Sequence, residues 1–319
     1  MKNTELLKAV ANEVKKVIIG KDSIVDLVLT AILAGGHILI EDIPGVGKTT
    51  LALAFSKAMS LEGKRMQFTP DVLPTDVTGF SVYNKAGGEF EYKPGVAMCN
   101  LFLADEINRT SPKTQSALLE VMEEGKITVD GVTHEVPKPF IVIATQNPLG
   151  AAGTQPLPES QLDRFMIRLT MGYPADKDEV NMLCKQRESG GIADLKSVID
   201  GQMLKELQAA AEKVFLDYKI MAYIVKLVNL TRRHPLVRLG LSPRATLALA
   251  SVARACAFAQ GRDYVIPEDV QFVFEPVANH RLLLEPRAKI DERTVSDVLQ
   301  EILRQAGAVE LASSRVAAK

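Results

Sequence analysis

The first half of the chain alternates short apolar runs with segments of helical periodicity. The apolar runs occupy residues 37–40, 64–68, 101–104, 140–144 and 165–170. Short apolar runs separated by helices are typical of a parallel sheet that is covered by helices on both faces. The pattern therefore predicts an α/β domain with a parallel five-stranded sheet over residues 1–175.

The second half of the chain has no comparable apolar run. Helical patterns follow one another over residues 177–188, 202–214, 219–232, 243–260, 267–279 and 294–305. Proline at the start of two of these segments, Pro243 and Pro267, is typical of a helix N-terminus. We therefore expect an all-helical second domain over residues 176–319.

Two segments interrupt the alternation of strand and helix in the first half. Residues 126–136 read KITVDGVTHEV, two alternating stretches around Asp130 and Gly131. This dipeptide readily adopts the positive φ angles of a type I′ turn, so a β-hairpin is expected there. Residues 78–94 hold several glycines and aromatic side chains and are a second candidate insertion. The helix between them is expected to be capped by Ser111 and to end at Gly125.

The composition narrows the class of protein. The chain has 319 residues, a formal net charge of −1 and three cysteines, without metal-type Cys/His spacing. These values exclude a disordered chain and a disulfide-rich scaffold. The net charge near zero argues against a protein whose main role is to bind nucleic acid. No apolar stretch reaches the length of a membrane helix, and the N-terminus is unlike a signal peptide. We expect a cytoplasmic protein.

The segment IEDIPGVGKTT, residues 40–50, carries the strongest chemical signal, because it follows an apolar strand and opens a helix. Backbone N–H groups of such a loop form an anion cradle at the helix N-terminus. Lys48 would reach the β- and γ-phosphates of ATP, and the Thr49 hydroxyl would bind Mg²⁺. Asp42 stands where GxxxxGK[ST] has its first glycine, which leaves the cradle itself intact. The expected nucleotide-binding residues are Pro44, Gly45, Val46, Gly47, Lys48, Thr49 and Thr50.

Polar residues also follow two later apolar runs. Asp105 and Glu106 end the run at residues 101–104, where Asp105 would hold Mg²⁺ through water and Glu106 would polarise the attacking water. Asn147 follows the run at residues 140–144, just beyond a strand end, where α/β folds place ligand groups. Taken alone, each of these polar groups could also be a solvated strand end or a turn.

These motifs, together with LPESQLDRF at residues 157–165 and GLSPR at residues 240–244, resemble those of the MoxR family of AAA+ ATPases. The resemblance extends to the strings RMQFTPDVLPTDVTG and ADEINRTSPKTQSALLEVMEEG and covers residues 17–287. It implies an AAA+ P-loop NTPase core with a helix-2 insertion, a hairpin ahead of the sensor strand and an all-helical lid. The insertion matches residues 78–94, and the hairpin matches residues 127–133.

The resemblance also implies the roles of individual residues. Lys48 and Glu106 match the catalytic Walker A and Walker B residues, and Asn147 matches sensor 1. Arg164 matches the arginine finger that acts on the neighbouring subunit's nucleotide, with Arg168 as a second candidate. The other implied contacts are Thr49 and Asp105 to Mg²⁺, Arg244 as sensor 2, and Ile18, Ile19 and Gly20 against adenine.

The implied function is Mg²⁺-dependent hydrolysis of ATP to ADP in a homo-oligomeric ring, usually a hexamer, which remodels or matures a client protein. MoxR relatives often act on proteins with von Willebrand A domains. Three alternatives stay open. A nucleic-acid motor is disfavoured because the tip of the hairpin, residues 129–132, carries an acid and no basic residue. A small-molecule kinase and a slow, nucleotide-gated scaffold are the others.

Overall fold

The computed structural model describes residues 2–43, 45–85, 87–147, 154–187 and 191–307. The chain forms two compact units, Met1–Ala211 and Glu212–Lys319. We expected the division after residue 175, but it comes later because the following segment bonds to the first unit. The N–H of Val198 donates to the carbonyl of Ala58 over 2.8 Å, and the side chain of Gln208 donates to the carbonyl of Ile32 over 2.7 Å.

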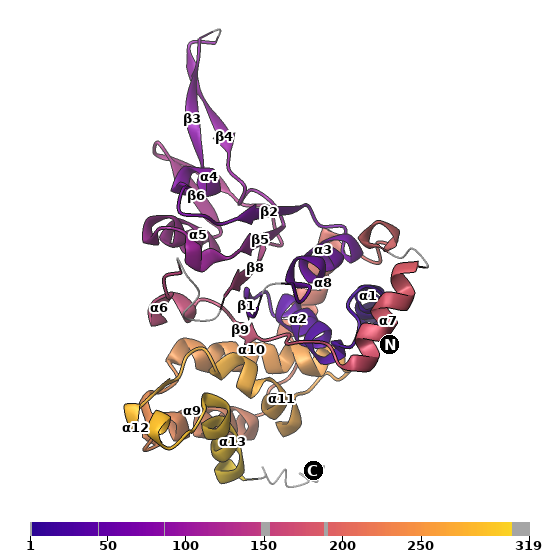
Figure 1. Ribbon diagram of the computed structural model, residues 1–319, viewed down its shortest axis with the longest axis vertical. Helices are drawn as coiled ribbons and strands as arrows, with labels where there is room; N and C mark the ends of the chain where they lie inside the picture. The colour runs from indigo at the N-terminus through magenta and orange to yellow at the C-terminus, as the bar shows by residue number, and fades with distance from the viewer. Residues whose placement is uncertain (1, 44, 86, 148–153, 188–190, 308–319) are drawn as a thin grey trace, which may run out of the picture. The chain divides into compact units, whose positions relative to one another are not determined.

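A parallel five-stranded sheet lies at the centre of the first unit, in the order β2-β5-β8-β1-β9 (Figure 1). Each strand overlaps one of the apolar runs of the sequence, so the predicted α/β sheet is confirmed. The inner strands are buried along their length because helices cover both faces. The strands are β1 (Ile38–Glu41), β2 (Gly63–Gln67), β5 (Leu101–Asp105), β8 (Ile141–Gln146) and β9 (Ile167–Leu169).

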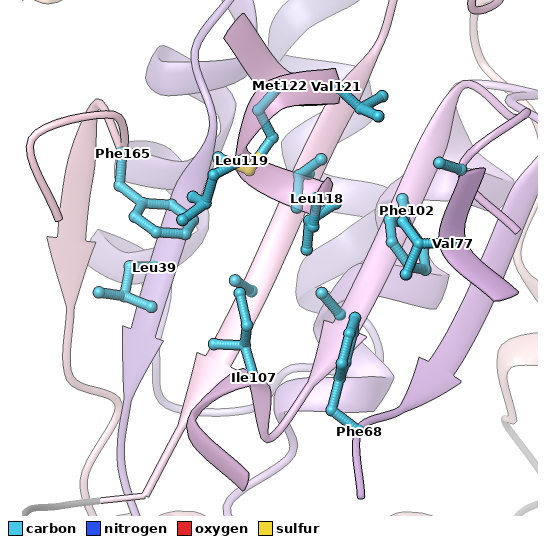
Figure 2. Packing of buried hydrophobic residues seen from close by; sticks show 14 of the residues in the cluster. Leu39, Phe68, Val77, Phe102, Ile107, Leu118, Leu119, Val121, Met122 and Phe165 are labelled. Atoms are coloured by element: carbon cyan, nitrogen blue, oxygen red, sulfur yellow. The ribbon is translucent and has the colours of Figure 1, made fainter. Parts of the chain in front are cut away.

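Helix α5 (Pro112–Glu124) covers one face of the sheet with a stripe of apolar side chains (Figure 2). Leu118 and Met122 belong to a buried cluster that also holds Phe102 of β5 and Phe165. The helix begins and ends as the sequence predicts, because Ser111 accepts the N–H of Thr114 and Gly125 is left-handed, with φ 62°. The other helices packed in this unit include α1 (Lys2–Lys15), α2 (Asp22–Leu33), α3 (Lys48–Ala58) and α8 (Gly201–Glu212).

Both expected insertions are β-hairpins. The first joins β3 (Gly79–Asn84) to β4 (Glu89–Pro94) and projects from the sheet in Figure 1. The second joins β6 (Lys126–Val129) to β7 (Val132–Glu135), and its turn residues Asp130 and Gly131 have φ 49° and 78°, which agrees with the expected turn. The two hairpins meet where Tyr92 stacks on His134 with ring centroids 3.9 Å apart. Short elements complete the unit: α4 (Pro74–Thr78), η1 (Ile107–Arg109), α6 (Glu159–Leu162), α7 (Asp176–Arg187) and η2 (Ile192–Asp194).

The second unit is helical, with one correction to the all-helical prediction. Strands β10 (Val237–Leu239) and β11 (Leu283–Leu284) pair antiparallel. Strands of three and two residues are too short to show an alternating pattern, so they could not be predicted from hydrophobic periodicity. Within the described parts of the chain, no helix is both long and apolar enough to span a membrane. The helices are α9 (Tyr218–Arg233), α10 (Pro243–Ala259), α11 (Pro267–Ala278), α12 (Pro286–Ile290) and α13 (Val295–Ala306).

Candidate functional site

Most of the predicted site residues lie along the edge of the sheet where its strands end. β1 ends at Glu41 just before the phosphate loop, and β5 ends at Asp105. β8 ends at Gln146, one residue before Asn147. In open α/β sheets, ligands bind outside the carboxyl ends of the strands. The fold therefore gathers side chains from distant parts of the sequence at a position suited to a ligand.

The phosphate loop runs from β1 into helix α3 without any side chain that caps the helix. Gly45 and Gly47 have φ 87° and 94°, a conformation that other residues rarely adopt. Gly47 is the N-cap of α3, and the first N–H groups of a helix have no acceptor within it. Apart from its two chain neighbours, no described residue has a heavy atom within 4 Å of the place where a Cβ on Gly45 would stand. The loop therefore fits an anion such as a phosphate group, whereas Pro44 lies outside the described residues.

Asp42 anchors the start of this loop. Its carboxylate accepts the backbone N–H of Ile43 over 2.8 Å, and those of Met171 and Gly172 over 2.6 Å each. The side chain is buried, so these three donors replace the water that the carboxylate gives up. The position that usually holds the first glycine is thus occupied by a residue that ties the loop to the segment following β9.

Lys48 is a buried cation beside three carboxylates. Its Nζ donates to the backbone carbonyl of Asp42 over 2.7 Å, and 7% of the residue is exposed. Burial lowers the pKa of Lys48, and the carboxylates of Asp42, Asp105 and Glu106 act in the opposite direction. The lysine therefore lies close to the two acids that the sequence assigned to the same site.

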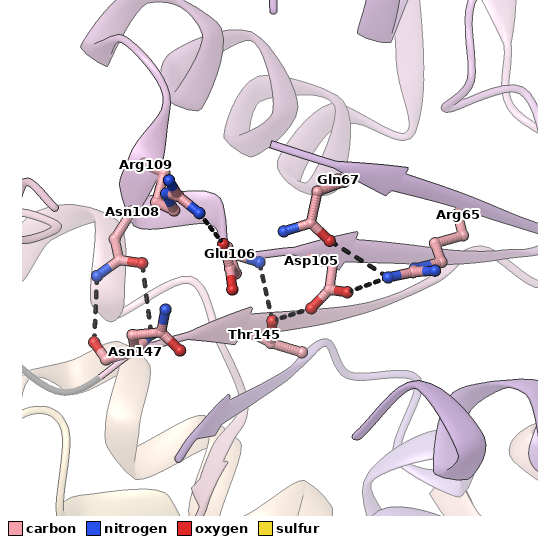
Figure 3. A network of polar contacts seen from close by, with 8 residues as sticks. All are labelled: Arg65, Gln67, Asp105, Glu106, Asn108, Arg109, Thr145 and Asn147. Atoms are coloured by element: carbon pink, nitrogen blue, oxygen red, sulfur yellow. Dashed lines mark hydrogen bonds and ion pairs between the residues drawn. The ribbon is translucent and has the colours of Figure 1, made fainter. Parts of the chain in front are cut away.

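Thr145, a buried residue of β8, links these two acids (Figure 3). Its hydroxyl donates to Asp105 Oδ1 over 2.6 Å and accepts the backbone N–H of Glu106 over 2.8 Å. The other carboxylate oxygen of Asp105 pairs with Arg65 Nη2 at 2.8 Å, and this arginine also donates to Gln67. Both oxygens of Asp105 are therefore engaged by side chains of β2 and β8.

Glu106 is held in a turn by its own neighbours. Its backbone is left-handed, with φ 56° and ψ 47°, which directs the chain from β5 into the η1 turn. Its carboxylate pairs with Arg109 Nη1 at 2.7 Å, and the Glu106 side chain is 18% exposed. The carboxylate expected to activate water is thus engaged by an arginine three residues later.

Asn147 is the point at which this set of contacts is incomplete. The buried side chain of Asn108 donates to the carbonyl of Asn147 over 3.2 Å and accepts its N–H over 3.4 Å. The side-chain oxygen Oδ1 of Asn147 is buried and has no hydrogen-bond partner within the described structure. A buried acceptor without a donor is uncommon, so a bound water or ligand would complete it. The Asn108–Asn147 pair lies beside the linked set Arg65, Asp105, Thr145, Glu106 and Arg109 at this edge of the sheet (Figure 3). We call the two sets together the sheet-edge network: Arg65, Asp105, Glu106, Asn108, Arg109, Thr145 and Asn147.

Both candidates for the arginine finger are paired within the chain. Arg164 Nη1 lies 2.6 Å from Glu123 Oε2 and donates to the carbonyl of Leu119 over 2.8 Å, both on α5. Arg168 on β9 pairs with Glu41 of β1 at 3.1 Å, which ties two neighbouring strands together. Arg168 makes the contacts of a residue inside the sheet. Arg164 lies in the turn between α6 and β9 and contacts the surface of α5.

The residues predicted to meet adenine follow helix α1. Ile18 is buried, Ile19 is half-buried and Gly20 is exposed. Gly20 has φ 74°, and a side chain on it would collide with Asp178 of α7. Arg244 belongs to the second unit, in the first turn of α10, where Ser242 accepts the N–H of Ala245 as the N-cap. The nucleotide contacts assigned to these residues remain predictions.

Comparisons with known proteins agree with this architecture. The model of the ATPase family associated with various cellular activities (AAA) matches residues 37–167, and the AAA lid domain matches residues 229–302. The chain is 39% identical to Chaperone MoxR1 of Mycobacterium tuberculosis, over 92% of this chain and 79% of that protein. It is 49% identical to the uncharacterised protein YeaC of Bacillus subtilis, over 93% of both chains.

The chain belongs to the MoxR family of AAA+ ATPases. The crystal structure of a candidate ATPase from Cytophaga hutchinsonii has the same fold, with a TM-score of 0.88 and 36% identity over 95% of this chain and 94% of that one. Family membership accounts for the order of the five strands, the two hairpins and the helical second unit. The roles of the individual site residues stay predictions.

The residues present fit the Mg²⁺-bound nucleotide that this family implies. The hydroxyl of Thr49 and the carboxylate of Asp105 are oxygen ligands of the kind that Mg²⁺ prefers, and Mg²⁺ usually takes one or two from the protein. No group of three or more His, Cys, Asp or Glu side chains in the described chain could hold a metal by itself. An ion at this site of the MoxR-family chain would therefore rely on phosphate oxygens and water as well.

Four residues of the sheet-edge network were missed by the sequence analysis. Asn108 and Arg109 lie inside the string DEINR, in which a chemical role was predicted only for the two acids. Thr145 follows four buried apolar residues of β8, and a hydroxyl at such a position indicates a buried hydrogen bond. Arg65 gave no signal, because only the pairing of β2 with β5 brings it to Asp105.

Proposed function

We propose that this chain hydrolyses ATP, with Mg²⁺, at the carboxyl edge of its sheet. The observation that carries the proposal is the convergence of Lys48, Asp105 and Glu106 beside Asn147, whose buried side-chain oxygen lacks a donor. A cation, two carboxylates and an open acceptor are what phosphoryl transfer to water requires. The family membership of the chain supports the same activity.

Each residue has a separate task in this proposal. Lys48 neutralises phosphate charge, and the N–H groups at the start of α3 bind phosphate oxygens. The bound magnesium ion supplies additional positive charge at the phosphates, and Thr49 and Asp105 hold it. Glu106 accepts a proton from the attacking water, and Asn147 orients that water through Oδ1. For Glu106 to do so, its carboxylate has to leave Arg109.

We propose further that the ATPase works as a ring, usually a hexamer, in which Arg164 serves the neighbouring subunit. Within one chain Arg164 is held by Glu123 on α5, and both side chains are partly exposed. A partly exposed ion pair contributes little, about 0–1 kcal/mol, so exchanging Glu123 for phosphate oxygens costs little, although Arg164 would also give up its bond to the carbonyl of Leu119. An arginine finger supplied by another subunit would make hydrolysis depend on assembly.

The ring would use hydrolysis to remodel a client protein, as a chaperone does. The support is the likeness to Chaperone MoxR1, which is named for that activity. The client itself, with the von Willebrand A domain suggested by the sequence resemblance, remains a prediction. The β3–β4 hairpin, which projects from the sheet in Figure 1, exposes Phe80, Tyr83 and Phe90 and is the part of the described chain best suited to meet it.

A subunit-mixing experiment tests the proposed site and the finger together. Arg164→Ala keeps its own Glu106 but offers no finger, whereas Glu106→Gln offers a finger but cannot activate water. Each variant alone is expected to be inactive, and their mixture is expected to regain ATP hydrolysis. A mixture that stays inactive would contradict the finger assignment.

The matched control mixes Glu106→Gln with Lys48→Ala. Both variants carry an intact Arg164, and neither carries a complete site, so this mixture should remain inactive whatever the ring does. Replacing Arg164→Ala by Arg168→Ala in the first mixture tests the second finger candidate. Because Arg168 pairs with Glu41 inside the sheet and this variant keeps Arg164 and Glu106, we expect it to lose stability but to hydrolyse ATP on its own. An Arg168→Ala protein that is inactive alone and regains hydrolysis on mixing would assign the finger to Arg168.

A further inference from the structure

The second unit contains a cavity of about 590 Å³ that no part of the proposed function uses. It lies between the C-terminal end of α9, which supplies Arg233 and His234, and α13 with the residue before its N-cap. The second wall supplies Arg293, Glu301 and Arg304. The volume falls in the range of small-molecule sites. We call this site the arginine cavity.

Positive charge outweighs negative charge in the arginine cavity. Its lining holds three guanidinium groups, which are always protonated, and one carboxylate, that of Glu301. Hydrogen bonding to Arg293 lowers the pKa of Glu301, so this carboxylate stays ionised. Arg233 and Arg304 lie in the last turns of α9 and α13, where a cation interacts favourably with the negative end of the helix dipole. That position explains two of the charges but not the buried donors beside them.

His234 belongs to the lining of the cavity, and its buried Nε2 lacks an acceptor in the described part of the chain. The backbone N–H of Leu236 donates to His234 Nδ1 over 3.2 Å, so in the neutral ring the proton is on Nε2. The His234 side chain is 5% exposed, and its Nε2 has no hydrogen-bond partner within the described structure. The carboxylate oxygen Oε1 of Glu301 lies 3.6 Å from Nε2, beyond hydrogen-bond distance.

Arg293 supplies a second buried donor. Its Nη2 pairs with Glu301 Oε2 at 2.5 Å, but its Nε is buried without a partner within the described structure. Buried N–H groups are nearly always hydrogen-bonded, so two such donors around one cavity point to an acceptor that completes them. Water could accept from both, but water would leave the excess positive charge of the cavity unbalanced.

We propose that the arginine cavity binds a phosphate group, either as inorganic phosphate or as part of a small phosphomonoester. A phosphate offers several acceptor oxygens arranged as a tetrahedron, so it can take bonds from donors on both walls at once. Arginine suits such a ligand because its planar guanidinium can donate two parallel bonds. A carboxylate has two oxygens in one plane and meets fewer of the donors.

Calorimetric titration of the full chain tests this proposal. The titration uses the Lys48→Ala background, which removes the cation of the phosphate loop and weakens phosphate binding there. The cavity variants below distinguish binding in the cavity from any binding that remains at the loop, so failure of the ATPase proposal leaves the result unaffected. Inorganic phosphate and glycerol 2-phosphate are the probes, and acetate is the carboxylate control. We expect saturable binding of one phosphate per chain, with acetate binding more weakly.

Two exposed arginines provide variants that should fold. Arg233→Ala and Arg304→Ala are each expected to weaken phosphate binding by about tenfold or more. Arg238 is an exposed residue of β10 and is not part of the cavity lining. The control variant Arg238→Ala should therefore leave the affinity for phosphate unchanged. If phosphate does not saturate at millimolar concentration, or if all three variants bind equally well, the proposal is wrong.

Discussion

Two regions of this molecule combine arginines with carboxylates, and they do so in opposite ways. At the carboxyl edge of the sheet, Arg65 and Arg109 have their own carboxylate partners at 2.8 and 2.7 Å. In the lining of the arginine cavity of the second unit, the described chain places three arginines, Arg233, Arg293 and Arg304, beside one carboxylate, that of Glu301, which pairs with Arg293. The first region balances its charge within the chain, whereas the second needs an anion from outside.

The comparison teaches what each region should lose when a member is removed. At the sheet edge, removing a buried partner such as Thr145 leaves the polar groups that it binds without bonds, which costs more than the bond itself contributed. Removing a cation from a region with excess positive charge relieves repulsion. The two regions should therefore respond to substitution with opposite signs.

The largest effect is expected at Asp42, the anchor of the phosphate loop. Asp42→Ala leaves the N–H groups of Ile43, Met171 and Gly172 without their acceptor, and it should lower the free energy of unfolding by about 2–4 kcal/mol. Chemical denaturation measures this change. Asp42→Asn keeps one acceptor oxygen and should lose about half as much. A loss within experimental error for Asp42→Ala would show that the anchor has no energetic importance.

Acid should weaken the first unit through His37. The ring of His37 donates to the carbonyl of Met122 and accepts the N–H of Val142, each over 3.0 Å, so the folded state holds it neutral. Burial lowers the pKa of His37 to about 4, and the hydrogen bond to the carbonyl of Met122 acts in the opposite direction. Between about pH 6.5 and 4 the unfolded chain binds a proton that the folded chain does not.

Stability should therefore fall as the pH is lowered through this window, by about 2–3 kcal/mol, and level off below it. Denaturation curves recorded from pH 7 to 4 provide the measurement. His37→Gln should flatten this part of the profile, although it also lowers stability at pH 7. A profile of the same slope in both proteins would assign the pH dependence to other groups.

A smaller loss is expected when the bridge of the sheet-edge network is removed. Thr145→Val keeps the shape of the side chain but leaves Asp105 Oδ1 and the N–H of Glu106 without a partner. We expect a loss of about 1–3 kcal/mol in the free energy of unfolding, together with slower ATP hydrolysis. Thr145→Ser keeps the hydroxyl and serves as the matched control. Equal behaviour of the two variants would show that the hydroxyl is not needed.

The smallest effect, of opposite sign, is expected in the arginine cavity. Arg304→Ala should leave stability unchanged or raise it by up to about 1 kcal/mol in a phosphate-free buffer, because it removes excess charge. In phosphate buffer the wild-type chain should gain stability relative to the variant, since a ligand that binds the folded state stabilises it. Thermal unfolding in the two buffers measures both effects. If Arg304→Ala clearly destabilised the chain in phosphate-free buffer, the two regions would respond to substitution with the same sign, and the proposed contrast between them would be wrong.

The sequence predicted the fold well because its signals are local. Apolar runs marked the five strands, Ser111 and Gly125 marked the ends of α5, and the Asp130-Gly131 dipeptide marked a hairpin. The short pair β10 and β11 escaped prediction, since two or three residues carry no periodicity. The division between the units was expected before α7 because the pattern changes there, whereas contacts made by later residues decide it.

The candidate site was predicted less completely, because half of it depends on contacts across the sheet. Lys48, Asp105 and Asn147 follow strand ends and could be identified from the sequence. Thr145 and Arg65 matter only through the acid that they bind, and strand pairing alone brings them to it. The role of Asp42 could not be read from the loop, since two of its three donors lie 129 and 130 residues away.

ATP hydrolysis per subunit, measured over a wide range of protein concentration, tests the central claim of a shared active site most directly. If Arg164 completes the site of a neighbouring subunit, the rate per subunit should rise with concentration and reach a plateau as rings form. The assembled protein should exceed the isolated subunit by about 10³–10⁵-fold, the usual contribution of an arginine finger. A rate per subunit that is constant from the lowest concentration upward would contradict the claim and indicate a site complete within one chain.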